Sequence, residues 1–141
     1  MNVNKILKCD VSFRIISEKL DPSEITKILN TQPDTAHKKG DPNIKTTKKG
    51  KLSYYSPFEI GLWSIDTKKP EYETLENHIN GLLTLIEPYK NNIIEFSKKG
   101  YKTNMFCGIF SNGCVQPGFD INSEVLKKLG ELNISLSVCF Y

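Results

Sequence analysis

Two segments of this chain carry the same helix-start pattern, and each lies between strand-like runs. The first, 20–29, reads LDPSEITKIL, and the second, 119–129, reads FDINSEVLKKL with one residue inserted. In the first segment Asp21 is a favourable N-cap, and Pro22 fits the first helical position. Asp120 and the polar residues after it provide a similar start for the second. The repeated pattern predicts two related strand–helix–strand halves.

Strand-like runs precede and follow both predicted helices. Apolar and polar residues alternate in 9–16, 60–66 and 134–141, which is typical of strands with one buried face. The run 101–110 is apolar on both faces and predicts a central strand covered on both sides. If the strand over 60–66 lay at a sheet edge, two copies of the chain could pair there.

Between the two halves, residues 68–99 have helical periodicity. Apolar residues spaced by three or four form one stripe, made of Tyr72, Leu75, Ile79, Leu82, Leu83, Ile86 and Tyr89. Pro88 interrupts this helix, because proline lacks the backbone donor that a helix interior needs. Gly100 suits the position just after a second helix. The sequence therefore predicts an inserted helical pair.

These elements predict one α+β domain over residues 1–141, a length that suits a single hydrophobic core. Two strand–helix–strand halves favour a ferredoxin-like or related antiparallel sheet with helices packed on it, since that fold is a duplicated βαβ unit. The alternative is a larger antiparallel sheet with helices on one face.

Several classes of protein are disfavoured by what the sequence lacks. No run approaches the roughly 18 apolar residues of a membrane span, and the first ten residues lack the apolar core of a secretory signal. We therefore expect a cytoplasmic protein. The nucleotide-binding patterns G-x-x-x-x-G-K-[ST] and G-x-G-x-x-G are missing.

The four cysteines do not have metal-ligand spacing. Cys9, Cys107 and Cys139 lie in strand-like runs, Cys114 lies in a predicted loop over 111–118, and no C-x-x-C occurs. The sequence thus predicts buried free thiols, with no metal site and no cofactor.

Charge is concentrated in one segment. Six lysines lie between positions 38 and 51 against the single acid Asp41, in a chain whose formal net charge is only +3. Aromatic residues follow this segment. The predicted partner- or anion-binding residues are Lys38, Lys39, Lys45, Lys48, Lys49, Lys51, Tyr54, Tyr55 and Trp63. The simpler interpretation is a solvated loop, and the segment has no arginine and no RNA-binding signature.

An ordered set of short motifs resembles the bacterial family called domain of unknown function 4279. The motifs are Phe13-x-Ile15-x-Ser17, Leu20-Asp21-Pro22-x-Glu24-Ile25-Thr26, Pro33-Asp34, Lys39-Gly40-Asp41, Gly61-Leu62-Trp63-Ser64 and His78-Ile79. The resemblance covers nearly the whole chain. It implies a bacterial or phage-associated cytoplasmic protein of α+β type, and it brings no established activity, substrate or catalytic residue.

No catalytic set is predicted. His37 and His78 are the only histidines, and nothing in the sequence places either beside Cys107 or Cys114. We therefore favour a non-enzymatic binding protein, of an immunity or other inhibitory type, whose sheet face or lysine-rich segment engages another protein. The alternative is a small-anion or nucleotide-binding domain that uses the lysine-rich segment, and nucleic acid is a further candidate partner. The oligomeric state is left open.

Overall fold

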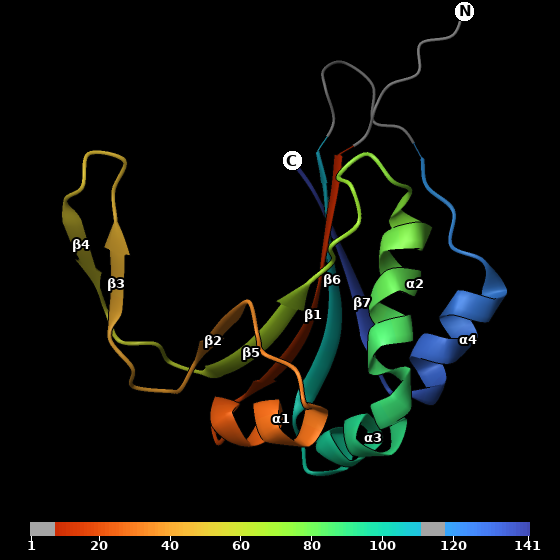
Figure 1. Cartoon of the computed structure of the whole chain (residues 1–141), viewed down its shortest axis with the longest axis horizontal. Helices are drawn as coiled ribbons and strands as arrows, with labels where there is room; N and C mark the ends of the chain where they lie inside the picture. Colours follow the sequence, from red (N-terminus) through yellow and green to blue (C-terminus); the bar gives the residue numbers. More distant parts are fainter. Residues whose placement is uncertain (1–7, 111–117) are drawn as a thin grey trace, which may run out of the picture.

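The computed structural model describes residues 8–110 and 118–141 (Figure 1). Within these residues a mixed sheet has the strand order β2-β5-β1-β6-β7, and β3 pairs with β4 in a separate hairpin. The strands are β1 (Lys8–Ser17), β2 (Thr35–His37), β3 (Asn43–Thr46), β4 (Leu52–Tyr55), β5 (Gly61–Asp66), β6 (Lys102–Phe110) and β7 (Ser135–Phe140). The helices are α1 (Pro22–Leu29), α2 (Leu75–Ile86), the short 3-10 segment η1 (Glu87–Tyr89), α3 (Lys90–Lys98) and α4 (Ser123–Glu131).

The α+β class is confirmed, but a ferredoxin-like topology is not. Strand β1 lies between β5 and β6 and is antiparallel to both. Strands β6 and β7 are parallel neighbours joined through α4. The two strand–helix–strand halves therefore differ in spacing. In the first, β5 lies between β1 and β2 and is antiparallel to both, whereas in the second β6 and β7 are direct parallel neighbours. The expected purely antiparallel sheet is wrong for the β6–β7 pair.

The repeated pattern sets the ends of the helices and not the order of the strands. The Asp21 side chain caps α1 by accepting from the Ser23 amide at 3.1 Å. Helix α4 is capped by Asn122 rather than by Asp120, and the Asn122 side chain accepts from the Val125 amide at 3.0 Å. Left-handed asparagines follow both helices, at Asn30 and Asn133. They supply the αL conformation that commonly ends a helix.

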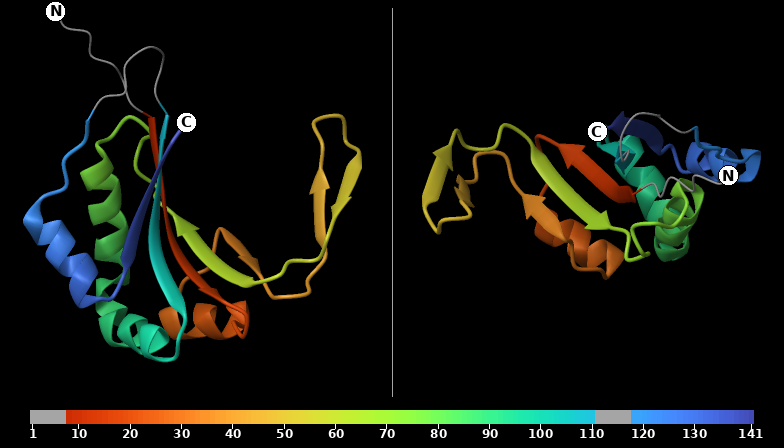
Figure 2. Two further views of the ribbon diagram at one scale, coloured as in Figure 1. Left: turned by 180° about the vertical axis from the view of Figure 1, so that it is seen from behind. Right: turned by 90° about the horizontal axis from the view of Figure 1, so that it is seen from above.

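The helical pair is confirmed, although α2 begins at Leu75 behind the N-cap Thr74 and not directly after Pro70. All four helices pack on one face of the described sheet, as the two views in Figure 2 show. This apolar face is built from alternate strand residues that are buried. They are Val11, Phe13, Ile15, Trp63, Ile65, Met105, Cys107 and Ile109.

The opposite side of the sheet, here called the polar face, carries the other strand residues. Its central members are Ser12, Arg14, Ser64, Asp66, Asn104, Phe106 and Ser137. The prediction that β6 is a central strand is confirmed, since it lies between β1 and β7, although the described helices cover only one of its sides. Strand β5 is not an edge strand, since β2 pairs with it. The predicted loop over 111–117, with Cys114, lies outside the described residues.

None of the helices in the described parts of the chain is long and apolar enough to cross a membrane.

Candidate functional site

The lysine-rich segment forms a hairpin rather than the loop expected from its composition. Strands β3 and β4 pair antiparallel, with Ile44 opposite Tyr54 and Thr46 opposite Leu52. We call residues 43–55 the hairpin arm. It projects from the β2–β5 end of the sheet, on the side away from α2 and α4 (Figures 1 and 2).

A compact neck joins the arm to the sheet. The Gly40 amide donates to the Phe58 carbonyl at 2.7 Å, and the Phe58 amide donates to the Asp41 carbonyl at 3.1 Å. The His37 ring stacks on the Phe58 ring with centroids 3.5 Å apart. The Asp41 carboxylate also accepts from the Lys38 amide at 2.7 Å. These contacts hold the two ends of the arm together at its base.

The two faces of the arm differ in chemistry, because side chains alternate along each strand. One face carries Ile44, Leu52 and Tyr54, whose exposed fractions are 48%, 55% and 73%. We call these three side chains the hairpin patch. The other face carries Lys45 beside Tyr55, with the ammonium nitrogen 5.3 Å from the ring centroid.

The structure divides the predicted lysine cluster in two. Lys38 and Lys39 lie near the neck and form exposed ion pairs with Asp21 at 3.8 Å and Glu18 at 3.7 Å. The remaining lysines belong to the arm and its tip, namely Lys45, Lys48, Lys49 and Lys51. Only the second group can present its charge on the arm.

Trp63 does not belong to an exposed aromatic surface, and this part of the predicted site is wrong. The side chain is completely buried, and its indole nitrogen donates to the Thr26 hydroxyl at 3.0 Å. Alternation along β5 turns Trp63 towards α1, because the register pairs it with the buried Ile15. Tyr54 and Tyr55, in contrast, are exposed on the arm.

Arg14, the only arginine of the chain, was missed by the sequence analysis and lies on the polar face. Its guanidinium carbon is 4.1 Å from the centroid of the Phe106 ring. Small polar groups surround this pair: the Ser12 hydroxyl donates to Asp66 at 2.7 Å, and the Ser137 hydroxyl donates to Asn104 at 3.1 Å. The usable signal was an arginine at a polar position of an alternating strand.

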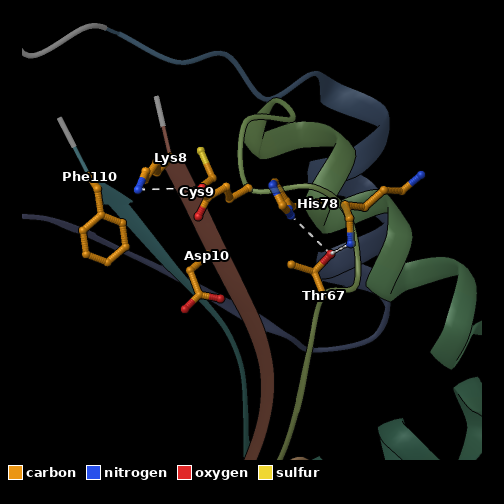
Figure 3. Close-up of a pocket in the computed structure, with 8 residues that line it drawn as sticks. Lys8, Cys9, Asp10, Thr67, His78 and Phe110 are labelled. Atoms are coloured by element: carbon orange, nitrogen blue, oxygen red, sulfur yellow. Dashed lines mark hydrogen bonds and ion pairs between the residues drawn. The ribbon is translucent and has the colours of Figure 1, made fainter. Parts of the chain in front are cut away.

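A pocket of about 430 Å³ lies at the other end of the sheet, beside the start of β1 (Figure 3). It is lined by Lys8, Cys9, Asp10, Thr67, Lys69, Glu71, His78 and Phe110. A second cavity of about 420 Å³ lies between the ends of α1 and β5 and helix α2. Neither lining includes a residue of the lysine-rich segment.

The pocket in Figure 3 is lined by a cysteine and a histidine from two elements, β1 and α2. The surroundings activate neither side chain for catalysis. Burial raises the pKa of the Cys9 thiol, so that thiol stays protonated. Burial lowers the pKa of His78, whose Nδ1 atom lies 3.2 Å from the Thr67 hydroxyl. Cys107 is fully buried in the core, and burial raises its pKa to about 12. These cysteines suit packing better than nucleophilic attack.

The lowered pKa of His78 predicts how the stability of the folded protein depends on pH. Its pKa is lowered in the folded protein, so the unfolded chain binds a proton first as the pH falls through about 6.5. The free energy of unfolding should therefore be highest above pH 6.5 and should fall between pH 7.5 and 5.5. Urea denaturation at both pH values should show a smaller difference for His78→Gln than for the wild type. Equal differences would contradict this role for His78.

The fold and these surfaces define an α+β protein with helices on one sheet face and a projecting hairpin arm. The chain belongs to the family described as domain of unknown function (DUF4279), whose model matches residues 7–141. No match was found among curated proteins or among solved structures. The resemblance seen in the sequence motifs is thus confirmed, and no activity comes with it.

Proposed function

We propose that this chain is a binding protein that engages a protein partner through the hairpin arm and the polar face. The observation that carries the proposal is the hairpin patch. Ile44, Leu52 and Tyr54 lie directly beside one another on one face of a projecting hairpin, and about half or more of each side chain is exposed. Burying the exposed part of each against a partner would contribute about 1 kcal/mol per side chain.

The charge of the arm supports a partner with an acidic surface. Lys45, Lys48, Lys49 and Lys51 are all on the arm, and residues 43–55 contain no acidic residue. Such a one-signed segment accelerates association with an oppositely charged surface, and the effect is lost as salt rises. An isolated two-stranded hairpin is marginally stable by itself, so a partner that packs on the patch would also order the arm.

Site-specific crosslinking in the native host tests this proposal. A benzophenone amino acid at position 54 should capture one protein in stoichiometric yield, because Tyr54 is the most exposed member of the patch. The same reagent at position 126 is the matched control, since Leu126 is 49% exposed on α4. Changing Ile44 and Leu52 to serine should reduce the yield at position 54 at least about tenfold. Because both side chains are exposed, the variant should remain folded.

Equal capture from positions 54 and 126, or none from either, would overturn the proposal. Capture of nucleic acid instead of protein at position 54 would also overturn it. The inhibitory, immunity-type role is the specific form that we propose for this binding. It requires the captured protein to have an activity that the purified chain blocks and that the Ile44→Ser, Leu52→Ser variant does not block.

A further inference from the structure

Arg14 is the only arginine of the chain and lies in a central strand of the sheet. It lies near the middle of β1, with Ser64 of β5 on one side and Asn104 of β6 on the other. The rest of the basic charge comes from lysine. Arginine differs from lysine because its planar fork of donors matches a carboxylate in a bidentate manner.

The guanidinium is held in place without an acidic partner. The guanidinium carbon lies 4.1 Å from the centroid of the Phe106 ring, and this cation–π contact holds the group over the ring. The side chain is half-buried, and its Nε atom is buried with no hydrogen-bond partner among the described residues. Within 8–110 and 118–141, no carboxylate is in ion-pair contact with Arg14. A partly desolvated cation with free donors is poorly compensated and is suited to an incoming anion.

The neighbours of Arg14 distinguish between kinds of anion. Asp66 lies diagonally across from it on β5, and Asp10 lies two positions beyond Ser12 on β1. These two acids share the polar face with Lys8 and Lys102, so the charge around Arg14 is mixed and lacks the one-signed surface that a polyanion such as nucleic acid needs. A single carboxylate brings only one charge, and its planar shape matches the guanidinium fork.

We propose that Arg14 binds one carboxylate of the protein partner, supplied by an aspartate or glutamate side chain that contacts the polar face. This inference rests on the proposed function and names the chemistry at the centre of the interface. Phe106 is a positioning residue in this site, because it orients the guanidinium.

The single arginine makes a direct test available. In a ¹⁵N-labelled sample the arginine Nε–Hε region contains one signal, and that signal belongs to Arg14. We expect the peptide acetyl-Ala-Glu-Ala-amide to shift it saturably, together with the backbone amides of Asn104 and Phe106. The matched peptide acetyl-Ala-Gln-Ala-amide and sodium chloride at equal ionic strength should not. A response to the glutamine peptide or to chloride equal to the glutamate response would overturn the inference, as would no response.

Three variants complete the test. Arg14→Gln should weaken binding of the glutamate peptide at least about tenfold, judged from the Asn104 and Phe106 amides, and Arg14→Lys should recover only part of it. Lys102→Gln is the control, because Lys102 is exposed further along the polar face. Folding of each variant is checked from the dispersion of its amide spectrum. Tighter binding of inorganic phosphate or an eight-nucleotide oligothymidine than of the glutamate peptide would assign the site to phosphate and overturn the carboxylate.

Failure of this inference and failure of the proposed function give different results. If position 54 captures a protein that Arg14→Gln binds as tightly as the wild type does, the carboxylate site is wrong and the binding function stands. If the glutamate peptide binds Arg14 but position 54 captures nothing, the function is wrong and the carboxylate site stands.

Discussion

Replacing residues 42–57 with a Gly-Asn-Gly turn is expected to leave the sheet and helices folded and to abolish capture of the partner. The replacement is feasible because the two ends of the segment already meet at the neck. The Gly40 amide donates to the Phe58 carbonyl, and the Phe58 amide donates to the Asp41 carbonyl. A short turn can therefore close the gap. The removed segment also contributes nothing to the buried core, which contains no residue between Leu29 and Trp63.

Two measurements separate the expected effects of this excision. Thermal unfolding should shift by no more than a few degrees, since the core residues are unchanged. Affinity for the captured partner should fall at least about a hundredfold, because the excision removes the whole hairpin patch and four lysines together. A triple variant, with Lys48, Lys49 and Lys51 changed to serine, is the control, and it should mainly slow association at low salt. A large loss of stability on excision would show that the arm belongs to the fold.

The second large effect is expected at Gly61, the first residue of β5. A Cβ atom there would lie 2.7 Å from the Ser17 carbonyl oxygen and 3.0 Å from the Leu20 Cβ atom. Neither neighbour is the flexible end of a side chain, so the backbone must shift. Gly61→Ala should therefore lower the free energy of unfolding by about 2–3 kcal/mol, in the range of overpacking.

Gly130 is the matched control, because a substitution to alanine there points into open space. A Cβ atom there meets nothing within 4 Å, and the residue lies in the last turn of α4. Gly130→Ala should raise stability by up to about 1 kcal/mol, because alanine has the higher helix propensity. Chemical denaturation of the two variants side by side checks the contrast. Similar changes at both positions would contradict the close approach at Gly61.

The parts of the fold that sequence could predict are those set by local chemistry. Asp21 and Pro22 place the start of α1, and the apolar stripe from Leu75 to Ile86 identifies α2. The order of the strands could not be predicted in this way. Similar helices follow β1 and β6, yet another strand, β5, lies between β1 and the strand after α1, whereas β6 and β7 are direct neighbours. That choice depends on which strands pair over long distances, and the capping residues carry no information about it.

The candidate site was predicted only in part for a related reason. A lysine-rich composition identified the segment, but the residues of the hairpin patch are ordinary apolar side chains such as Ile44 and Leu52. Their exposure arises because the arm leaves the sheet, which follows from the neck around Phe58. Trp63 was misassigned because aromatic character alone does not reveal which face of a strand is buried.

Substitutions in the arm and substitutions in the neck are expected to have different consequences. Substitutions in the arm change the surface that the proposed function assigns to the partner, and they leave the packing beneath the helices untouched. Substitutions at Gly40 or Phe58 alter the direction in which an unchanged arm points. Under the proposed function, a change of partner would require replacement of only one short segment, and a change at its base would reorient the same segment on an unchanged folded body.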